Sequence, residues 1–331
     1  MYKRFLKPIS LLLFSSMLIA LFLSGCDFST GTDNSSKTQS STAVSQKPTQ
    51  NSTVPTISIP DIDIESIPAE SVETSEETSE AVSKQPLEPA PVQDTDLHGL
   101  SVDECNRFFD DTVLIGDSFI EGFKNRYRQQ GGSDKNYFGK IVFLSSQNFG
   151  YLSANSTIAE GKKTYHPSYG GEQRYVWDVV GELKPPRIIV SLGLNDLQGK
   201  DADVYTFASM KKMLTKLKEA SPDSEIVMFS VPYYAKDGEK PDIYRTNEIN
   251  RNWNEKMLKY CNENGYDFIN LSDSMVNDEG YLDDKYAGPD KLHLKADVYY
   301  DKWLPYLRSY AANKILGQYS NVETVLWKIK E

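Results

Sequence analysis

The stretch Asp111-Thr112-Val113-Leu114-Ile115-Gly116-Asp117-Ser118-Phe119 predicts a buried strand that ends at a glycine and leads through a serine into a helix. Residues 112–115 are β-branched or apolar and have the length of a strand. Gly116 permits a tight turn. Ser118 is therefore expected at a helix start, where backbone N–H groups favour negative charge. This position suits a nucleophile whose reaction passes through an oxyanion, although a serine there can also serve only as a helix N-cap.

Short apolar strands and helical segments alternate through the rest of the domain. Further strands are expected at 140–144, 187–192, 225–231 and 267–271, and helices at 119–129, 204–220, 247–263 and 295–316. The second helix is strongly periodic, with one apolar face made by Phe207, Met210, Met213, Leu214 and Leu217. This alternation predicts an α/β fold, a three-layer doubly wound sheet of about five parallel strands. Sites in such sheets form beyond the carboxyl ends of the strands.

The charge of the chain is concentrated outside this domain. The 331 residues carry a net charge of −11, and residues 27–97 hold 13 Asp or Glu and 3 Lys among many Ser, Thr and Pro. Such a composition buries too little apolar surface to fold, so we expect residues 26–97 to be a disordered tether. Residues 98–331 form the expected domain. Their charge is nearly balanced and shows no basic stripe, which argues against a nucleic-acid partner.

The N-terminus has the pattern of an export signal. Basic residues precede a mostly apolar run over residues 9–23; they are Lys3, Arg4 and Lys7. The run closes with Leu23-Ser24-Gly25-Cys26, which resembles the lipobox of bacterial lipoproteins. The resemblance implies removal of residues 1–25, lipidation of Cys26 and a lipid anchor on the outer face of the cytoplasmic membrane. An uncleaved anchor or an ordinary signal peptide are the alternatives, and both also place the domain outside the cytoplasm.

Two further cysteines, Cys105 and Cys261, lie in the expected domain. In an exported protein they could form one disulfide. They could equally be free and buried, as single cysteines often are.

Three more segments lie where a site of this fold would form. Asn148-Phe149-Gly150 follows the second predicted strand, Gly193-Leu194-Asn195-Asp196 follows the third, and Asp290-Lys291-Leu292-His293 precedes the last helix. Each alone could be a turn, a cap or a solvated loop. With Gly116-Asp117-Ser118 before them, in this order, they resemble the four blocks of the SGNH (GDSL-type) hydrolase superfamily over roughly residues 108–315. The resemblance implies a flavodoxin-like fold and carboxylic ester hydrolysis.

The chemistry of these residues permits a role for each. A serine hydroxyl such as that of Ser118 needs a neighbouring base, and His293 is the one histidine of three that lies at the edge of a strand-helix unit. Asp290, three residues earlier, can reach the imidazole and select its tautomer. The oxyanion would be met by the backbone N–H groups of Ser118 and Gly150 and by the side-chain amide of Asn195. Gly150 is the least defined of these donors.

The remaining carboxylates of these blocks have a structural interpretation. Asp117 and Asp196 are expected to accept hydrogen bonds from backbone N–H groups and to hold the loops. One histidine with carboxylates is a poor ligand set for zinc. We therefore expect neither a metal nor a cofactor.

These inferences predict an extracytoplasmic serine esterase that removes O-acetyl or other short acyl groups from a carbohydrate, or cleaves another small ester, through an acyl-enzyme. Aromatic side chains of the loops could stack on sugar rings or pack in the core; they are Tyr151, Tyr165, Tyr169, Trp177, Tyr233 and Tyr234. One alternative is an O-acetyltransferase with the same residues, acting on cell-wall or surface polysaccharide. Another is a surface binding module without catalysis.

Overall fold

The computed structural model describes residues 95–159 and 164–321. The predicted export signal, Cys26 and nearly all of the predicted tether lie outside the described residues. Within the described ranges, no helix combines the length and the hydropathy needed to cross a membrane.

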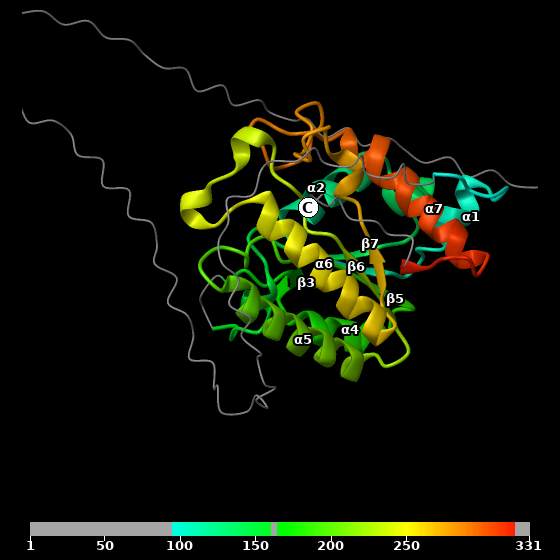
Figure 1. Cartoon of the computed structure of the whole chain (residues 1–331). Coiled ribbons are helices and arrows are strands. Elements are labelled where there is room, and N and C mark those ends of the chain that lie inside the picture. The colour runs from blue at the N-terminus through cyan, green and yellow to red at the C-terminus, as the bar shows by residue number, and fades with distance from the viewer. Residues whose placement is uncertain (1–94, 160–163, 322–331) are drawn as a thin grey trace, which may run out of the picture. The chain divides into compact units, whose positions relative to one another are not determined.

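A sheet of five parallel strands forms the middle layer, in the order β2-β1-β5-β6-β7. Figure 1 labels the last three of these strands. The strands are β1 (Val113–Gly116), β2 (Val142–Ser145), β5 (Arg187–Ser191), β6 (Glu225–Phe229) and β7 (Asp267–Ile269). This is the predicted doubly wound fold, and the prediction is confirmed. The order reverses direction between β1 and β5, which pair in register from Val113 with Ile188 to Gly116 with Ser191. Ligands of such sheets bind where the order reverses, beyond the carboxyl ends of these two strands.

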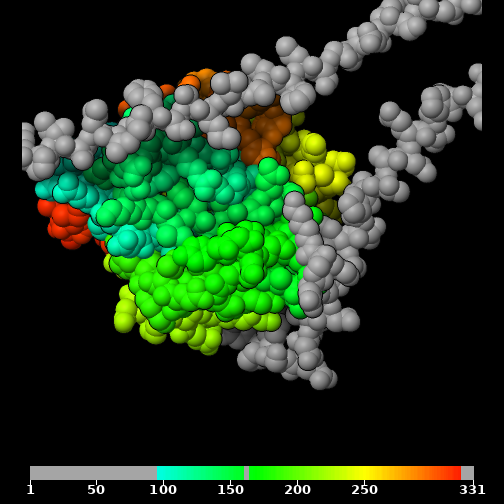
Figure 2. Space-filling model, turned by 180° about the vertical axis from the view of Figure 1, so that it is seen from behind, coloured from blue at the N-terminus to red at the C-terminus, as the bar shows by residue number. Residues whose placement is uncertain are grey.

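Helices cover both faces of the sheet (Figure 1). The contacts of α1 (Val102–Arg107) with α7 (Leu304–Ile315), and of α2 (Ser118–Gln129) with the π-helical turn η6 (Tyr299–Trp303), define one outer layer. The other layer contains α3 (Tyr151–Ala154), α4 (Val176–Leu183), α5 (Ala202–Ala220) and α6 (Asn247–Asn264). A two-stranded hairpin joins β3 (Ser168–Tyr169) to β4 (Glu172–Gln173). Figure 2 shows the molecule from behind, where the green segment between β2 and β5 covers much of the surface.

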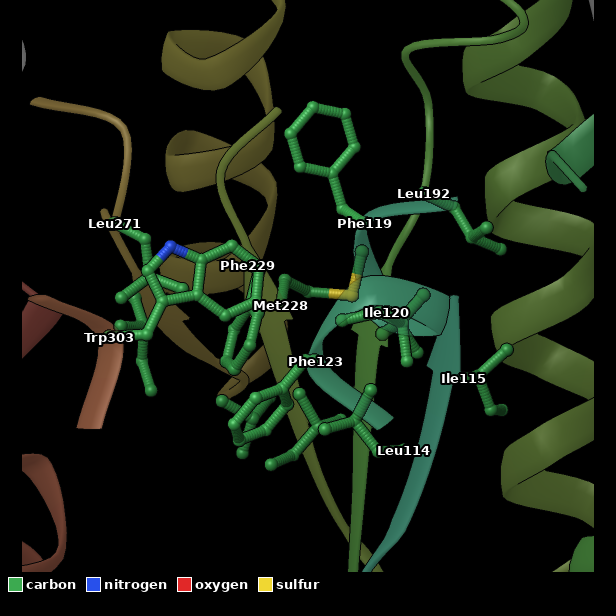
Figure 3. Close-up of a cluster of buried hydrophobic side chains, with 14 of the residues drawn as sticks. Leu114, Ile115, Phe119, Ile120, Phe123, Leu192, Met228, Phe229, Leu271 and Trp303 are labelled. Atoms are coloured by element: carbon green, nitrogen blue, oxygen red, sulfur yellow. The ribbon is translucent and has the colours of Figure 1, made fainter. Parts of the chain in front are cut away.

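The central strands are buried on both faces, as expected for a parallel sheet covered by helices. Figure 3 shows how side chains of β1, α2 and β6 interlock in the core. The Trp303 ring lies 5.8 Å from the Phe123 ring and 6.0 Å from the Phe229 ring, so it joins α2, β6 and the turn before α7. Cys105 and Cys261 are both buried and free.

The last helix differs from its prediction. We expected it over residues 295–316, but the α-helix spans Leu304–Ile315 and is preceded by the π-helical turn Tyr299–Trp303. Pro305 has no N–H and is tolerated in the first helical turn, which explains why the regular helix begins there.

The prediction from sequence also missed α1, although its start is marked. Ser101 and Glu104 form a capping box, with Ser101 accepting from the Glu104 N–H and Glu104 accepting from the Ser101 N–H. This spacing of serine and glutamate is visible in the sequence and could have identified the helix.

Candidate active site

The end of β1 leads to Ser118 through a turn that has no room for a side chain at Gly116. A Cβ atom at Gly116 would lie 2.1 Å from Ile120 Cγ1 and 3.1 Å from the Ser191 carbonyl oxygen, because α2 and β5 both approach closely there. The N-cap of α2 is Asp117, whose Oδ1 accepts the Phe119 N–H at 3.0 Å. Ser118 is the first helical residue. The alternative that Ser118 is only an N-cap is therefore wrong.

The structure brings Ser118, His293 and Asp290 into one chain of hydrogen bonds. Ser118 Oγ lies 2.7 Å from His293 Nε2, and His293 Nδ1 lies 2.5 Å from Asp290 Oδ2. The Phe119 ring stacks on the imidazole, with ring centroids 5.1 Å apart and planes inclined by 24°. Ser118 and His293 are 175 positions apart in the chain, so the tertiary fold brings the imidazole next to the hydroxyl group.

Asp290 is oriented by its own loop. Its Oδ1 accepts the backbone N–H groups of Leu292 at 3.2 Å and His293 at 3.0 Å, which leaves Oδ2 for the imidazole. Burial alone would raise the pKa of Asp290, but the hydrogen bonds from the His293 ring and from the two N–H groups outweigh burial and leave it below the usual value. Asp290 is therefore held as the carboxylate. The site is open, since the side chains of His293 and Asp290 are 43% and 52% exposed.

The loop that carries His293 is fastened to a segment that the sequence analysis did not single out. Lys291 adopts a left-handed φ of 61°, and its carbonyl oxygen accepts a hydrogen bond from the Ala235 N–H at 2.9 Å. A Cβ atom at Gly238 would lie 2.5 Å from that same oxygen. Residues 235–238 therefore form the seat of the histidine loop, and no local pattern in the sequence marks this contact.

Asn195 lies beside the serine turn. Its Nδ2 donates to Asp117 Oδ2 and to the Phe149 carbonyl oxygen, both at 3.2 Å, and so it joins the ends of β1 and β5 to the loop after β2. The neighbouring Gly150 N–H donates to Ser153 Oγ at 2.9 Å. In this arrangement the predicted oxyanion donor Gly150 thus already has an acceptor within its own turn.

Asp117 and Asp196 hold loops, as predicted. Asp196 accepts the backbone N–H groups of Tyr151 at 2.8 Å and Leu152 at 3.2 Å, and Asp117 accepts that of Phe119. Burial raises the pKa of Asp117 to about 7 and that of Asp196 to about 6, although the N–H groups pull in the other direction. Both carboxylates therefore titrate near neutral pH.

Among the described residues, no three His, Cys, Asp or Glu side chains are grouped as metal ligands would be. The aromatic residues suggested as sugar platforms divide into two sets. Tyr151, Tyr233 and Tyr234 are buried and pack in the core, which is the second of the two interpretations. Tyr165 is half exposed.

Solved structures of bacterial proteins resemble the chain at low sequence identity. A GDSL-like lipase from Bacteroides thetaiotaomicron is 18% identical, with 66% of this chain and 94% of that chain covered and a TM-score of 0.45. A carbohydrate acetylesterase from Sinorhizobium meliloti is 13% identical, with coverages of 63% and 100% and a TM-score of 0.43. The periplasmic domain of a lipopolysaccharide acetyltransferase from Salmonella Paratyphi A is 17% identical, with coverages of 64% and 86% and a TM-score of 0.40.

No curated protein matches the chain. A family model does match, over residues 114–300, which is more than half of the chain and includes all four blocks around Ser118, Gly150, Asn195 and His293. The chain belongs to the GDSL-like lipase/acylhydrolase family.

Proposed function

We propose that this acylhydrolase is an extracytoplasmic serine esterase that removes O-acetyl or other short acyl groups from a carbohydrate. The observation that carries the proposal is the chain of hydrogen bonds from Ser118 Oγ through the His293 imidazole to Asp290, at 2.7 Å and 2.5 Å. A serine so paired can lose its proton to the base as it attacks a carbonyl carbon.

The reaction would proceed in two halves. Ser118 Oγ bonds to the ester carbonyl carbon, His293 Nε2 takes the hydroxyl proton, and the same proton passes to the alcohol oxygen as the ester C–O bond breaks. Water then attacks the acyl-serine and gives one proton to His293, which passes it to Ser118 Oγ as the acyl C–Oγ bond breaks and the acid leaves. Asp290 holds the Nδ1 proton and stabilises the imidazolium of both halves.

The oxyanion of each tetrahedral intermediate needs donors that are already in place. The Ser118 N–H at the start of α2 and Asn195 Nδ2 are proposed for this role. Asn195 Nδ2 would turn from the Phe149 carbonyl oxygen or Asp117, and the Gly150 N–H would join them after leaving Ser153 Oγ, its present acceptor. The Ser118 N–H is therefore the primary donor in this proposal, and Asn195 and Gly150 complete the set.

The openness of the site favours hydrolysis over acyl transfer. Water has direct access to the acyl-serine, since about half of each of the His293 and Asp290 side chains is exposed. An O-acetyltransferase would have to exclude that water. The described site therefore supports transfer to water, and the polysaccharide acetyltransferase is the second candidate.

The test is the turnover of p-nitrophenyl acetate by the purified protein and by its Ser118→Ala variant. The matched control is Ser274→Ala, a half-buried serine whose hydroxyl donates to the Leu271 carbonyl. We expect loss of activity by about 10³-fold or more for Ser118→Ala and little change for the control. Equal turnover by wild type and Ser118→Ala would exclude the proposed nucleophile.

The location is proposed from the sequence alone, from the basic start, the apolar run and Cys26. Metabolic labelling with palmitate checks it. The wild type should incorporate label and sediment with membranes, whereas Cys26→Ser should not incorporate it. Labelling that persists in Cys26→Ser would exclude lipidation at this residue.

A further inference from the structure

A groove of about 340 Å³ opens next to the loop that carries Asn195. One wall is the connection from β5 into α5, from Leu197 to Asp203, and the other is the first half of α6 together with Tyr244. Both helices begin at the left of the view in Figure 1. The volume lies at the lower end of the range of about 300–1,000 Å³ found for small-molecule sites.

Two contacts connect the groove to the proposed catalytic edge. Gln198 donates to the Asn195 carbonyl oxygen at 3.4 Å and accepts from Arg245 Nη2 at 2.6 Å, so the residue after Leu197 ties both walls to Asn195. In addition, Trp253 lines the groove and also packs against Gly193. A Cβ atom added at Gly193 would lie 3.0 Å from the indole nitrogen of Trp253. A ligand in the groove would thus adjoin the loop that supplies Asn195.

The lining mixes apolar surface with charged and amide groups. Tyr244, Ile249 and Trp253 supply the apolar part, and Tyr244 is 42% exposed. Asp203 and Lys256 face each other at 3.2 Å, with side chains 49% and 36% exposed. Each of these charged groups has further hydrogen-bonding capacity, because an ammonium has three donors and a carboxylate about four acceptor sites.

Two residues on the rim adopt a costly backbone conformation. Tyr244 has a φ of 60° and Asp201 a φ of 58°, in the left-handed region that side chains other than glycine rarely adopt. Asp201 is the N-cap of α5, yet its side chain makes no capping hydrogen bond. Aspartate enters this region more readily than tyrosine, so it is chiefly the Tyr244 ring that the fold holds at the groove against local preference, as is typical of functional sites.

The chemistry of this lining selects among ligands. A fatty acyl chain requires an apolar lining and would cover the Asp203–Lys256 pair and the Asp201 carboxylate without offering them a hydrogen bond. A polyanion would meet two carboxylates, Asp201 and Asp203, against one ammonium. A neutral sugar ring fits both features, since its hydroxyl groups can bond carboxylates, ammonium and the Asn252 amide while its C–H face packs on Tyr244.

We propose that this groove binds a neutral sugar ring of the substrate and so selects the carbohydrate whose ester is cleaved. The proposal rests on the proposed function for its role in catalysis. Binding itself does not depend on ester hydrolysis, and this allows the two to be tested separately.

The binding test uses the full protein with Ser118→Ala, titrated with the tetrasaccharides of xylose, glucose and N-acetylglucosamine and followed by calorimetry. At least one tetrasaccharide should bind, and adding Tyr244→Ala should weaken that binding by about ten-fold. Adding Tyr205→Ala instead should change it by less than about two-fold, because Tyr205 is a 50% exposed tyrosine of α5 outside the lining. Thermal melting of each variant verifies that it is folded.

The catalytic test compares wild type, Tyr244→Ala and Tyr205→Ala on the acetylated form of the bound tetrasaccharide and on p-nitrophenyl acetate. The ratio of the two kcat/KM values should fall about ten-fold for Tyr244→Ala, through KM, and stay constant for Tyr205→Ala. Failure of all three tetrasaccharides to bind, or binding that Tyr244→Ala leaves intact, would overturn the inference. Binding by a protein whose wild type cleaves no ester would uphold the groove and refute only the proposed function.

Discussion

Replacing Asp290 by asparagine should reverse the tautomer of His293. Oδ1 of residue 290 is committed as an acceptor, because it receives the N–H groups of Leu292 and His293 at 3.2 Å and 3.0 Å. In Asp290→Asn the amide oxygen would keep this place and the NH₂ group would face Nδ1. Nδ1 would then have to accept, and Nε2 would carry the proton and could no longer take one from Ser118.

The size of the effect follows from this geometry. In a serine protease triad, an asparagine that imposes the wrong tautomer costs about 10⁴ in kcat, or about 5 kcal/mol of transition-state stabilisation. Here Asp290 and His293 are half exposed, so water can replace part of the lost contact. We therefore expect a loss between about 10² and 10⁴. Asp290→Ala should be no worse than Asp290→Asn, because water can accept the Nδ1 proton in the space that alanine leaves.

The assay is the kcat of p-nitrophenyl acetate hydrolysis by the purified variants, with melting temperatures recorded alongside. Asp297→Asn is the matched control, because the Asp297 side chain is 77% exposed and its carboxylate pairs with Arg126, which is 171 positions away in the chain. Its activity should stay within about two-fold of wild type. An Asp290→Asn enzyme that keeps activity within about three-fold of wild type would refute the assignment of Asp290 as the residue that orients the base.

Three further outcomes follow from the packing of the site. Gly150→Ala should lower both activity and melting temperature, because the new Cβ would lie 2.5 Å from both carboxylate oxygens of Asp196. Gly238→Ala should lower kcat, because the alanine Cβ would lie 2.5 Å from the Lys291 carbonyl oxygen and would displace the loop that carries His293. Burial raises the pKa of Asp117 in the folded protein to about 7, above its ordinary value of 3.8. Between these two pH values the folded state binds a proton that the unfolded state has lost, so the free energy of unfolding falls as the pH rises. Relative to Asp117→Asn, the wild type should therefore lose unfolding free energy between pH 4 and pH 7, with a slope of at most about 1.4 kcal/mol per pH unit.

Controls separate these effects from general damage. Gly181→Ala, in the interior of α4, places a Cβ at an ordinary 3.6 Å from the Ala220 Cβ and should be neutral or slightly stabilising. A Gly150→Ala protein as stable and active as Gly181→Ala would show that the loop has room to yield. For Asp117, urea unfolding at several pH values gives the slope, in which any constant cost of the substitution cancels. An identical slope in wild type and Asp117→Asn would contradict the raised pKa.

The sequence determined the sheet and, to within about two residues, the ends of its strands. Apolar runs such as residues 113–116 and 188–190 are typical of a parallel sheet covered by helices on both faces, and local composition is sufficient to reveal them. Since sites of such sheets lie beyond the carboxyl ends of the strands, the order of residues alone selects the segments around Ser118 and Asn195. The spacing of Asp290 and His293, three residues apart, likewise predicted their contact.

Only the tertiary structure decided what meets across long separations. The imidazole of His293 reaches Ser118 because residues 235–238 seat its loop and Phe119 stacks against its ring, and neither contact leaves a pattern in the sequence. The same holds for aromatic residues: composition cannot separate a core tyrosine such as Tyr233 from an exposed one such as Tyr244, because burial depends on what packs against each side chain. Secondary structure follows largely from neighbouring residues, whereas the site and its groove arise from contacts that exist only once the chain has folded.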